Sequence, residues 1–157
     1  MLLAWREYIR LADPDIITGY NICNFDFNYL ILRAEYLGIK DYPKFTRING
    51  MLCRIKDAVS QSSALGNREY KDMNTEGRIF FDMHTYAVRE LKLVQYSLNS
   101  LSHELLGEQK EDIYPAQITQ LFNGSDETRR RLATYGLKNA RLPLLVMQKL
   151  DCLMQIS

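Results

Sequence analysis

Five polar residues stand next to the ends of predicted elements and could take part in chemistry: Asn21, Asp26, Asp82, Tyr135 and Asn139. Asn21 and Asp26 bound a polar turn between a short β-branched run and a helical pattern. In open α/β sheets, ligands bind at such turns, beyond the carboxyl ends of the strands. Asp26 is therefore the first candidate for a functional carboxylate.

Tyr135 and Asn139 are four residues apart in a predicted helix, so they share one of its faces. A tyrosine and a carboxylate at this spacing, facing an aspartate at a strand end, would suit two-metal phosphodiester hydrolysis. In that chemistry carboxylates hold two cations about 3.5–4 Å apart, and one cation activates water. The tyrosine hydroxyl would bind the phosphate or orient the water. This chain, however, has an amide at position 139.

The first forty residues predict an α-β-α order. Apolar spacing indicates a helix over Leu2–Leu11, which ends before Pro14 because proline excludes the helical conformation at the preceding residue. Residues 16–20 form a β-branched and aromatic run typical of a buried strand. A helix follows from Phe25 to Leu37, with Gly38 placed as its C-terminal cap.

The middle of the chain indicates strands. Residues 47–56 and 68–82 suggest a β-hairpin with a long tip, although their alternation is poor. Residues 77–82 make a better strand that ends in Asp82. The sequence therefore predicts a mixed α/β domain with most of its helices in the second half.

The second half predicts helices over 83–93 and 97–106, the latter capped by Ser97. Residues 107–112 form a charged connector, and Pro115 begins a helix that ends near Asn123. Ser125 caps the next helix, which reaches Asn139. Pro143 either kinks that helix or starts a final one.

Composition limits the class of protein. The chain has 157 residues, 46% hydrophobic and 25% charged, with a net charge of +1, which is typical of one globular domain and gives no overall basic signal for nucleic acid. Its three cysteines lack disulfide or zinc spacing, which favours a reducing compartment. No apolar run is long enough for a membrane span and no signal peptide is evident, so we expect a soluble intracellular domain without a membrane partner.

Three separated stretches together resemble the proofreading 3′–5′ exonuclease domain of family B DNA polymerases. They read GYNICNFDFNYL, YSLNSLSHELLGEQKEDI and ETRRRLATYGLKNARLPLLVMQKL. The resemblance covers nearly the whole chain, and the LGEQKED connector resembles the delta type. It implies a ribonuclease H-like fold in which a mixed sheet is flanked by helices and carries an inserted β-hairpin near DNA, here the 47–82 region. The implied partners are the 3′ end of single-stranded DNA and the rest of a delta-type catalytic subunit, in the nucleus.

The resemblance also implies roles for individual residues. Asn21-x-x-x-Phe25-Asp26 matches the second exonuclease motif, which makes Asp26 a catalytic, metal-binding carboxylate and places Asn21 and Phe25 beside the 3′-terminal nucleotide. Tyr135-x-x-x-Asn139 matches the third motif, in which the tyrosine assists the attacking water and an aspartate binds Mg²⁺ or Mn²⁺. Asn139 stands in place of that aspartate.

The chain departs from the family pattern in a second way. The family's first motif, Asp-x-Glu on an opening strand, does not occur in the 20 residues before Asn21. We therefore expect residues 1–157 to form a single partial exonuclease domain, N-terminally truncated and without the polymerase palm, fingers and thumb. Since Asp26 alone remains of four expected carboxylates, we expect weak or absent binding of the two cations and no independent exonuclease activity.

Structural interpretations stand beside these functional ones. Asp26 could cap its helix, Tyr135 could be a core residue of an amphipathic helix, and Asn139 could be a helix-end amide. For Asp82, at a strand end but in no known motif, a structural role is favoured. Arg129–Arg131 could contact a DNA backbone, although a solvated helix face is the simpler interpretation.

Two other functional classes are compatible with the sequence. One is a non-catalytic module that binds DNA or another part of a polymerase. The other is a truncated gene product with no independent function, because a sheet without its opening strands would expose an unpaired edge.

Overall fold

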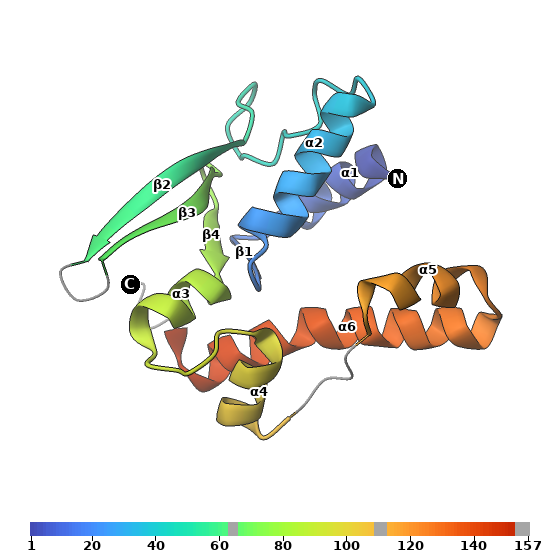
Figure 1. Ribbon diagram of the computed structural model, residues 1–157. Helices are drawn as coiled ribbons and strands as arrows, with labels where there is room; N and C mark the ends of the chain where they lie inside the picture. The colour runs from blue at the N-terminus through green and yellow to red at the C-terminus, as the bar shows by residue number, and fades with distance from the viewer. Residues whose placement is uncertain (63–65, 109–112, 153–157) are drawn as a thin grey trace. The chain divides into compact units, whose positions relative to one another are not determined.

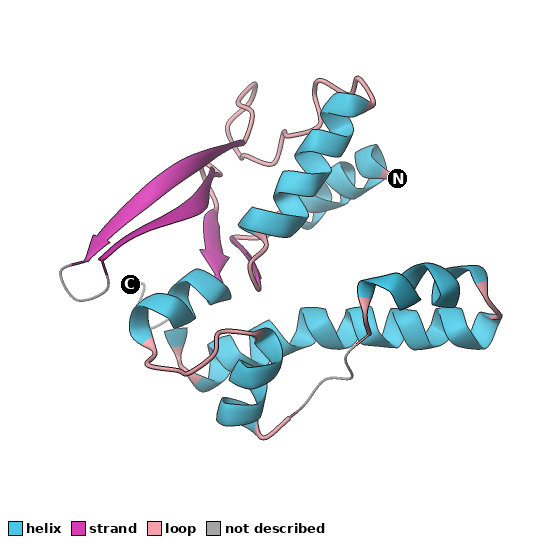
Figure 2. Ribbon diagram, in the orientation of Figure 1, coloured by secondary structure: helices cyan, strands magenta, loops and turns pink. Residues whose placement is uncertain are grey.

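The computed structural model describes residues 1–62, 66–108 and 113–152. It is a mixed α/β structure, as the sequence predicts (Figures 1 and 2). It divides into two compact units, Met1–Tyr86 and Ala87–Ser157, and helix α3 (Met83–Glu90) crosses the division. Each unit is described by itself below. Among the described residues, none of the helices combines the length and the apolar character that crossing a membrane requires.

The first unit is built around a parallel strand pair. β1 (Ile16–Gly19) lies beside β4 (Ile79–Asp82), with Gly19 opposite Asp82, so the carboxyl ends of both strands meet at one edge (Figure 1). Helix α1 (Leu2–Ala12) precedes β1, and α2 (Asn28–Tyr36) follows it. The predicted α-β-α order is confirmed, with Gly38 in a left-handed conformation (φ 72°) just after α2.

A separate antiparallel hairpin lies between α2 and β4. β2 (Arg54–Ser62) pairs with β3 (Gly66–Asn74) from Arg54 opposite Asn74 to Ser62 opposite Gly66 (Figure 2). The predicted strand bounds and the long tip are wrong. Residues 47–53 form a loop, and the Thr46 hydroxyl just before it donates a hydrogen bond to the carbonyl of Ile48 at 2.9 Å. The strands extend toward the tip as far as Ser62 in β2 and Gly66 in β3. Of the predicted hairpin region 47–82, residues 63–65 lie outside the described part of the chain.

An aromatic cluster forms the core of the first unit. Trp5 of α1 contacts Phe27 and Phe45 edge-on, with ring centroids 5.8 and 5.4 Å apart, and Phe27 contacts Phe80 of β4 at 5.2 Å. Tyr42 and Phe45 are fully buried. Edge-to-face pairs of this kind contribute about 0.5–1.5 kcal/mol each beyond their buried area. The cluster therefore holds Phe27, the residue that follows Asp26, against both α1 and β4.

The second unit is helical. α4 (Leu98–Leu106) and α5 (Pro115–Asn123) pack against the long helix α6 (Asp126–Lys149). The predicted caps are confirmed. The Ser97 side chain accepts a hydrogen bond from the backbone N–H of Ser100, and the Ser125 side chain accepts one from the backbone N–H of Thr128. The predicted charged connector 107–112 lies outside the described residues from position 109 onward.

Helix α6 corrects the expected end at Asn139. It continues without a break through Pro143 to Lys149, so Pro143 does not begin a separate helix. Leu142, Pro143 and Val146 are buried, and their apolar packing offsets the hydrogen bond that proline cannot donate.

Candidate nucleic-acid site

The turn after β1 is held by the side chain at the end of β4. Asp82 Oδ1 accepts the backbone N–H of Asn21 at 2.7 Å, and Oδ2 accepts that of Cys23 at 3.3 Å. Asn21 adopts a left-handed conformation (φ 58°), which asparagine tolerates better than most residues. The Asn21 side-chain oxygen in turn accepts a hydrogen bond from Asn24 Nδ2 at 2.6 Å. The first half of the predicted motif is therefore fixed by backbone and side-chain hydrogen bonds.

Asp82 also begins helix α3. Its Oδ1 accepts the backbone N–H of His84 at 2.9 Å, the hydrogen bond of a helix N-cap. One carboxylate thus ties the start of α3 to the turn after β1. The sequence favours a structural role for Asp82 but does not predict this bridge, because its only sequence signal is a carboxylate at a strand end.

Residues Cys23–Phe27 form one wide helical turn before α2. The N–H of Phe27 donates to the carbonyl of Ile22, five residues earlier, at 2.9 Å, which is the π-helical pattern. Such turns are rare and occur frequently at functional sites. Cys23 and Phe27 point into the core, whereas Phe25 and Asp26 are exposed. Phe25, predicted to lie beside the 3′-terminal nucleotide, and Asp26, predicted to bind a metal ion, therefore lie side by side on the surface.

The electrostatics of this turn disfavour charge. Partial desolvation, and secondly the negative charge of Asp82, raise the pKa of Asp26 above its ordinary value. Burial, together with the charge of Asp82, raises the pKa of Cys23 to about 12. The Cys23 thiol is therefore protonated at neutral pH.

The third predicted motif lies in the second unit, on α6. Tyr135 and Asn139 are half-buried, and the Asn139 amide oxygen is buried without a hydrogen-bond partner among the described residues. Tyr135 lines a groove of about 400 Å³ on α6. The other lining residues are mainly basic or polar: Glu127, Arg130, Arg131, Thr134 and Lys138. Three cations against one carboxylate make this groove suited to an anionic partner.

Few of the described metal-ligating side chains gather within either unit. In the part of the chain that the structure describes, no three His, Cys, Asp or Glu side chains gather closely enough to hold a metal ion. Both oxygens of Asp82 already accept backbone N–H groups, and Asp26 has a raised pKa. Mg²⁺ requires several hard oxygen ligands in octahedral geometry, and Asn139 supplies only a neutral one.

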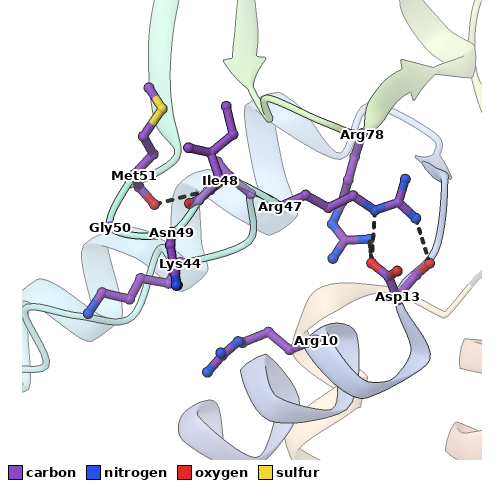
Figure 3. Close-up of a pocket in the computed structure, with 10 residues that line it drawn as sticks. Arg10, Asp13, Lys44, Arg47, Ile48, Asn49, Gly50, Met51 and Arg78 are labelled. Atoms are coloured by element: carbon purple, nitrogen blue, oxygen red, sulfur yellow. Dashed lines mark hydrogen bonds and ion pairs between the residues drawn. The ribbon is translucent and has the colours of Figure 1, made fainter.

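A second cavity, of about 390 Å³, lies at the opposite end of β1 and includes none of the predicted site residues. There the carboxylate of Asp13, just after α1, accepts a hydrogen bond from Arg47 Nε at 2.9 Å and forms an ion pair with Arg78 at 2.8 Å (Figure 3). Arg78 is almost completely buried and also donates to the carbonyls of Phe45 and Pro14. This cluster is a structural clamp between α1, the 44–51 loop and the start of β4.

Comparison with known proteins identifies the family. Residues 1–101 match the model of the DNA polymerase family B exonuclease domain, so the chain belongs to that family. Within it, the chain is similar to catalytic subunits of DNA polymerase delta, as the resemblance predicted. It is 51% identical over 157 residues to the Candida albicans subunit and 47% identical over 150 residues to that of Bos taurus.

The coverage of these matches is unequal. The alignment with the Candida albicans protein covers 100% of this chain, and the alignment with the Bos taurus protein covers 96%. The Oryza sativa subsp. japonica protein is 52% identical, also over 96% of this chain. The chain spans only about 15% of the length of these relatives. Tyr135 and Asn139, the predicted third motif, lie outside the family model's match but inside the alignment with the Candida albicans subunit.

Proposed function

We propose that this chain is part of the 3′–5′ proofreading exonuclease domain of a delta-type DNA polymerase and binds the 3′ end of single-stranded DNA. The observation that carries the proposal is the turn Asn21–Asp26, which places an exposed aromatic ring and a carboxylate next to each other after a strand. Phe25 is 68% exposed, which suits stacking on a terminal base. Asn21 and Phe25 would contact the nucleotide, and Asp26 would face its phosphate through a cation.

The proposal extends to the fold and the setting. Both units would belong to one ribonuclease H-like exonuclease domain, with β2–β3 as the hairpin near DNA and the rest of the polymerase as partner, acting in the nucleus. Similarity to delta catalytic subunits over the whole chain supports this placement. Tyr135 and Asn139 would serve as the third motif.

We further propose that the chain does not hydrolyse DNA by itself. The family reaction depends on Mg²⁺ or Mn²⁺ held by several carboxylates, and the donors described above do not fit that pair of ions. Tyr135 can still orient water or phosphate, but Asn139 cannot supply the negative charge of an aspartate. The expected behaviour is binding of a 3′ end without turnover.

A non-catalytic DNA-binding module is the second candidate, and the groove on α6 favours it. Arg130, Arg131 and Lys138 would contact phosphates rather than bases. In this case binding would not depend on the 3′ end. A polymerase-interaction module, or a product without independent function, would show no DNA binding at all.

Fluorescence anisotropy separates these candidates. The purified chain is titrated into a 5′-fluorescein-labelled oligothymidylate with a free 3′-hydroxyl, and into the same oligomer closed by a 3′-phosphate. Our proposal predicts salt-sensitive binding that is tighter for the free 3′ end. Equal affinity for both oligomers would favour the α6 groove, and no binding at low salt would contradict both DNA-binding candidates.

A further inference from the structure

The carboxylate of Asp82 makes hydrogen bonds that an apolar side chain could not replace. It lies at the carboxyl edge of the β1–β4 pair, directly opposite Gly19, where the chain leaves β1 (Figure 1). Its two oxygens accept three backbone N–H groups, from Asn21, Cys23 and His84, at 2.7, 3.3 and 2.9 Å. Charged acceptors form stronger hydrogen bonds than neutral ones, so this carboxylate is a firm anchor.

We infer that Asp82 is a positioning residue for recognition of the 3′-terminal nucleotide, acting through the turn that carries Asn21, Phe25 and Asp26; this inference rests on the proposed function. The anchored N–H groups begin and end the left-handed bend at Asn21. That bend sets where the wide turn Cys23–Phe27 starts, and hence the direction in which Phe25 projects.

An anchor is needed here because the turn has few other constraints on its outer side. The core holds only its inner residues, Cys23 and Phe27, which are 2% and 5% exposed. Phe25 and Asp26 are exposed, so packing does not fix them. The hydrogen bonds to Asp82 add to those within the turn and tie it to β4, and the negative charge of Asp82 raises the pKa of nearby Asp26.

The Asp82→Asn variant tests this role. An amide keeps one acceptor oxygen but turns a donor toward backbone N–H groups, so the three hydrogen bonds cannot all persist. We expect the preference for a free 3′-hydroxyl over a 3′-phosphate to fall roughly tenfold, as the loss of hydrogen bonds to a charged group implies. Asp41→Asn is the matched control: the same charge change on an exposed residue whose carboxylate pairs with Lys44 at 3.1 Å.

A spectroscopic readout distinguishes positioning from general stability. In ¹H–¹⁵N spectra of the full chain, Asp82→Asn should shift the amide signals of Asn21, Cys23 and His84 and speed their hydrogen exchange, while the cooperative melt of Trp5 fluorescence is kept. Should Asp82→Asn not fold, Asp82→Glu, which keeps the charge but displaces it, is expected to show the same loss of 3′-end preference.

The outcomes separate the inference from the function beneath it. If the wild-type chain shows no 3′-end preference, the proposed function fails and the inference with it. If the wild type has that preference and folded Asp82→Asn or Asp82→Glu keeps it, the inference alone is overturned. Unfolding of both variants would also overturn it, because Asp82 would then be a residue of global stability.

Discussion

Asp82 accepts the backbone N–H of Asn21 across 61 residues of sequence, and this hydrogen bond joins the ends of two parallel strands at the point where the predicted second exonuclease motif begins. The same edge carries Asp26, whose pKa is raised in part by the charge on Asp82. The charge on Asp82, which anchors the turn, therefore acts directly on Asp26 in the candidate site.

Replacing Asp82 by asparagine should lower the pKa of Asp26 without returning it fully to its ordinary value. The negative charge is removed, but desolvation, the larger cause of the shift, stays. A ¹³C-detected NMR titration of the Asp26 carboxyl group in both proteins measures the change. An Asp26 pKa that rises in Asp82→Asn would contradict the account of this edge.

Ionisation of Asp26 should destabilise the folded chain. Because its folded-state pKa is raised, the folded state binds the proton more tightly than the unfolded state. The stability that this contributes is present below the ordinary aspartate pKa and is lost as the pH rises through the raised value. Melting temperatures measured across this range should fall less for Asp26→Asn than for the wild type. A steeper fall in the variant would show that the sign is wrong.

Phe25→Ala should weaken binding of the free 3′ end and leave thermal stability unchanged. The ring is 68% exposed, so little packing is lost, whereas stacking on one base contributes about 1–3 kcal/mol. The matched control is Phe122→Ala on α5, which removes a ring that is 62% exposed outside the motif. Equal losses of affinity in the two variants would remove Phe25 from the site.

Arg78→Ala should destabilise the first unit. Its side chain is 3% exposed, and its removal leaves the Phe45 and Pro14 carbonyls without their donor. An unsatisfied buried acceptor costs about 1–3 kcal/mol. Denaturant unfolding followed by Trp5 fluorescence measures the loss, with Arg10→Ala as control because Arg10 pairs with Glu7 at the surface. Similar losses in both variants would mean that the clamp at Asp13 is not structural.

Local signals predicted the helices well. Ser97, Pro115 and Ser125 mark helix starts through their own chemistry, so those starts could be located from neighbouring residues alone. The end of α6 could not, because whether a helix passes through Pro143 depends on the packing of that residue with distant ones.

The candidate site was predictable only in part. Asn21, Phe25 and Asp26 lie close together in the sequence, and the exposure of Phe25 and Asp26 follows from the turn that carries them. The anchoring by Asp82 depends on the parallel pairing of β1 with β4, which brings residues from both ends of the first unit to one edge. Hairpin bounds were missed because β2 and β3 are rich in polar residues and show little alternation.

The central claim, binding of a 3′ end without hydrolysis, is tested most directly by incubating the chain with 3′-labelled single-stranded DNA and Mg²⁺ or Mn²⁺. Released mononucleotides are separated by electrophoresis, with Asp26→Ala as the control for a contaminating nuclease. We expect no release above that control, under conditions where anisotropy shows the DNA bound. Metal-dependent release of mononucleotides by the wild type, lost in Asp26→Ala, would contradict it.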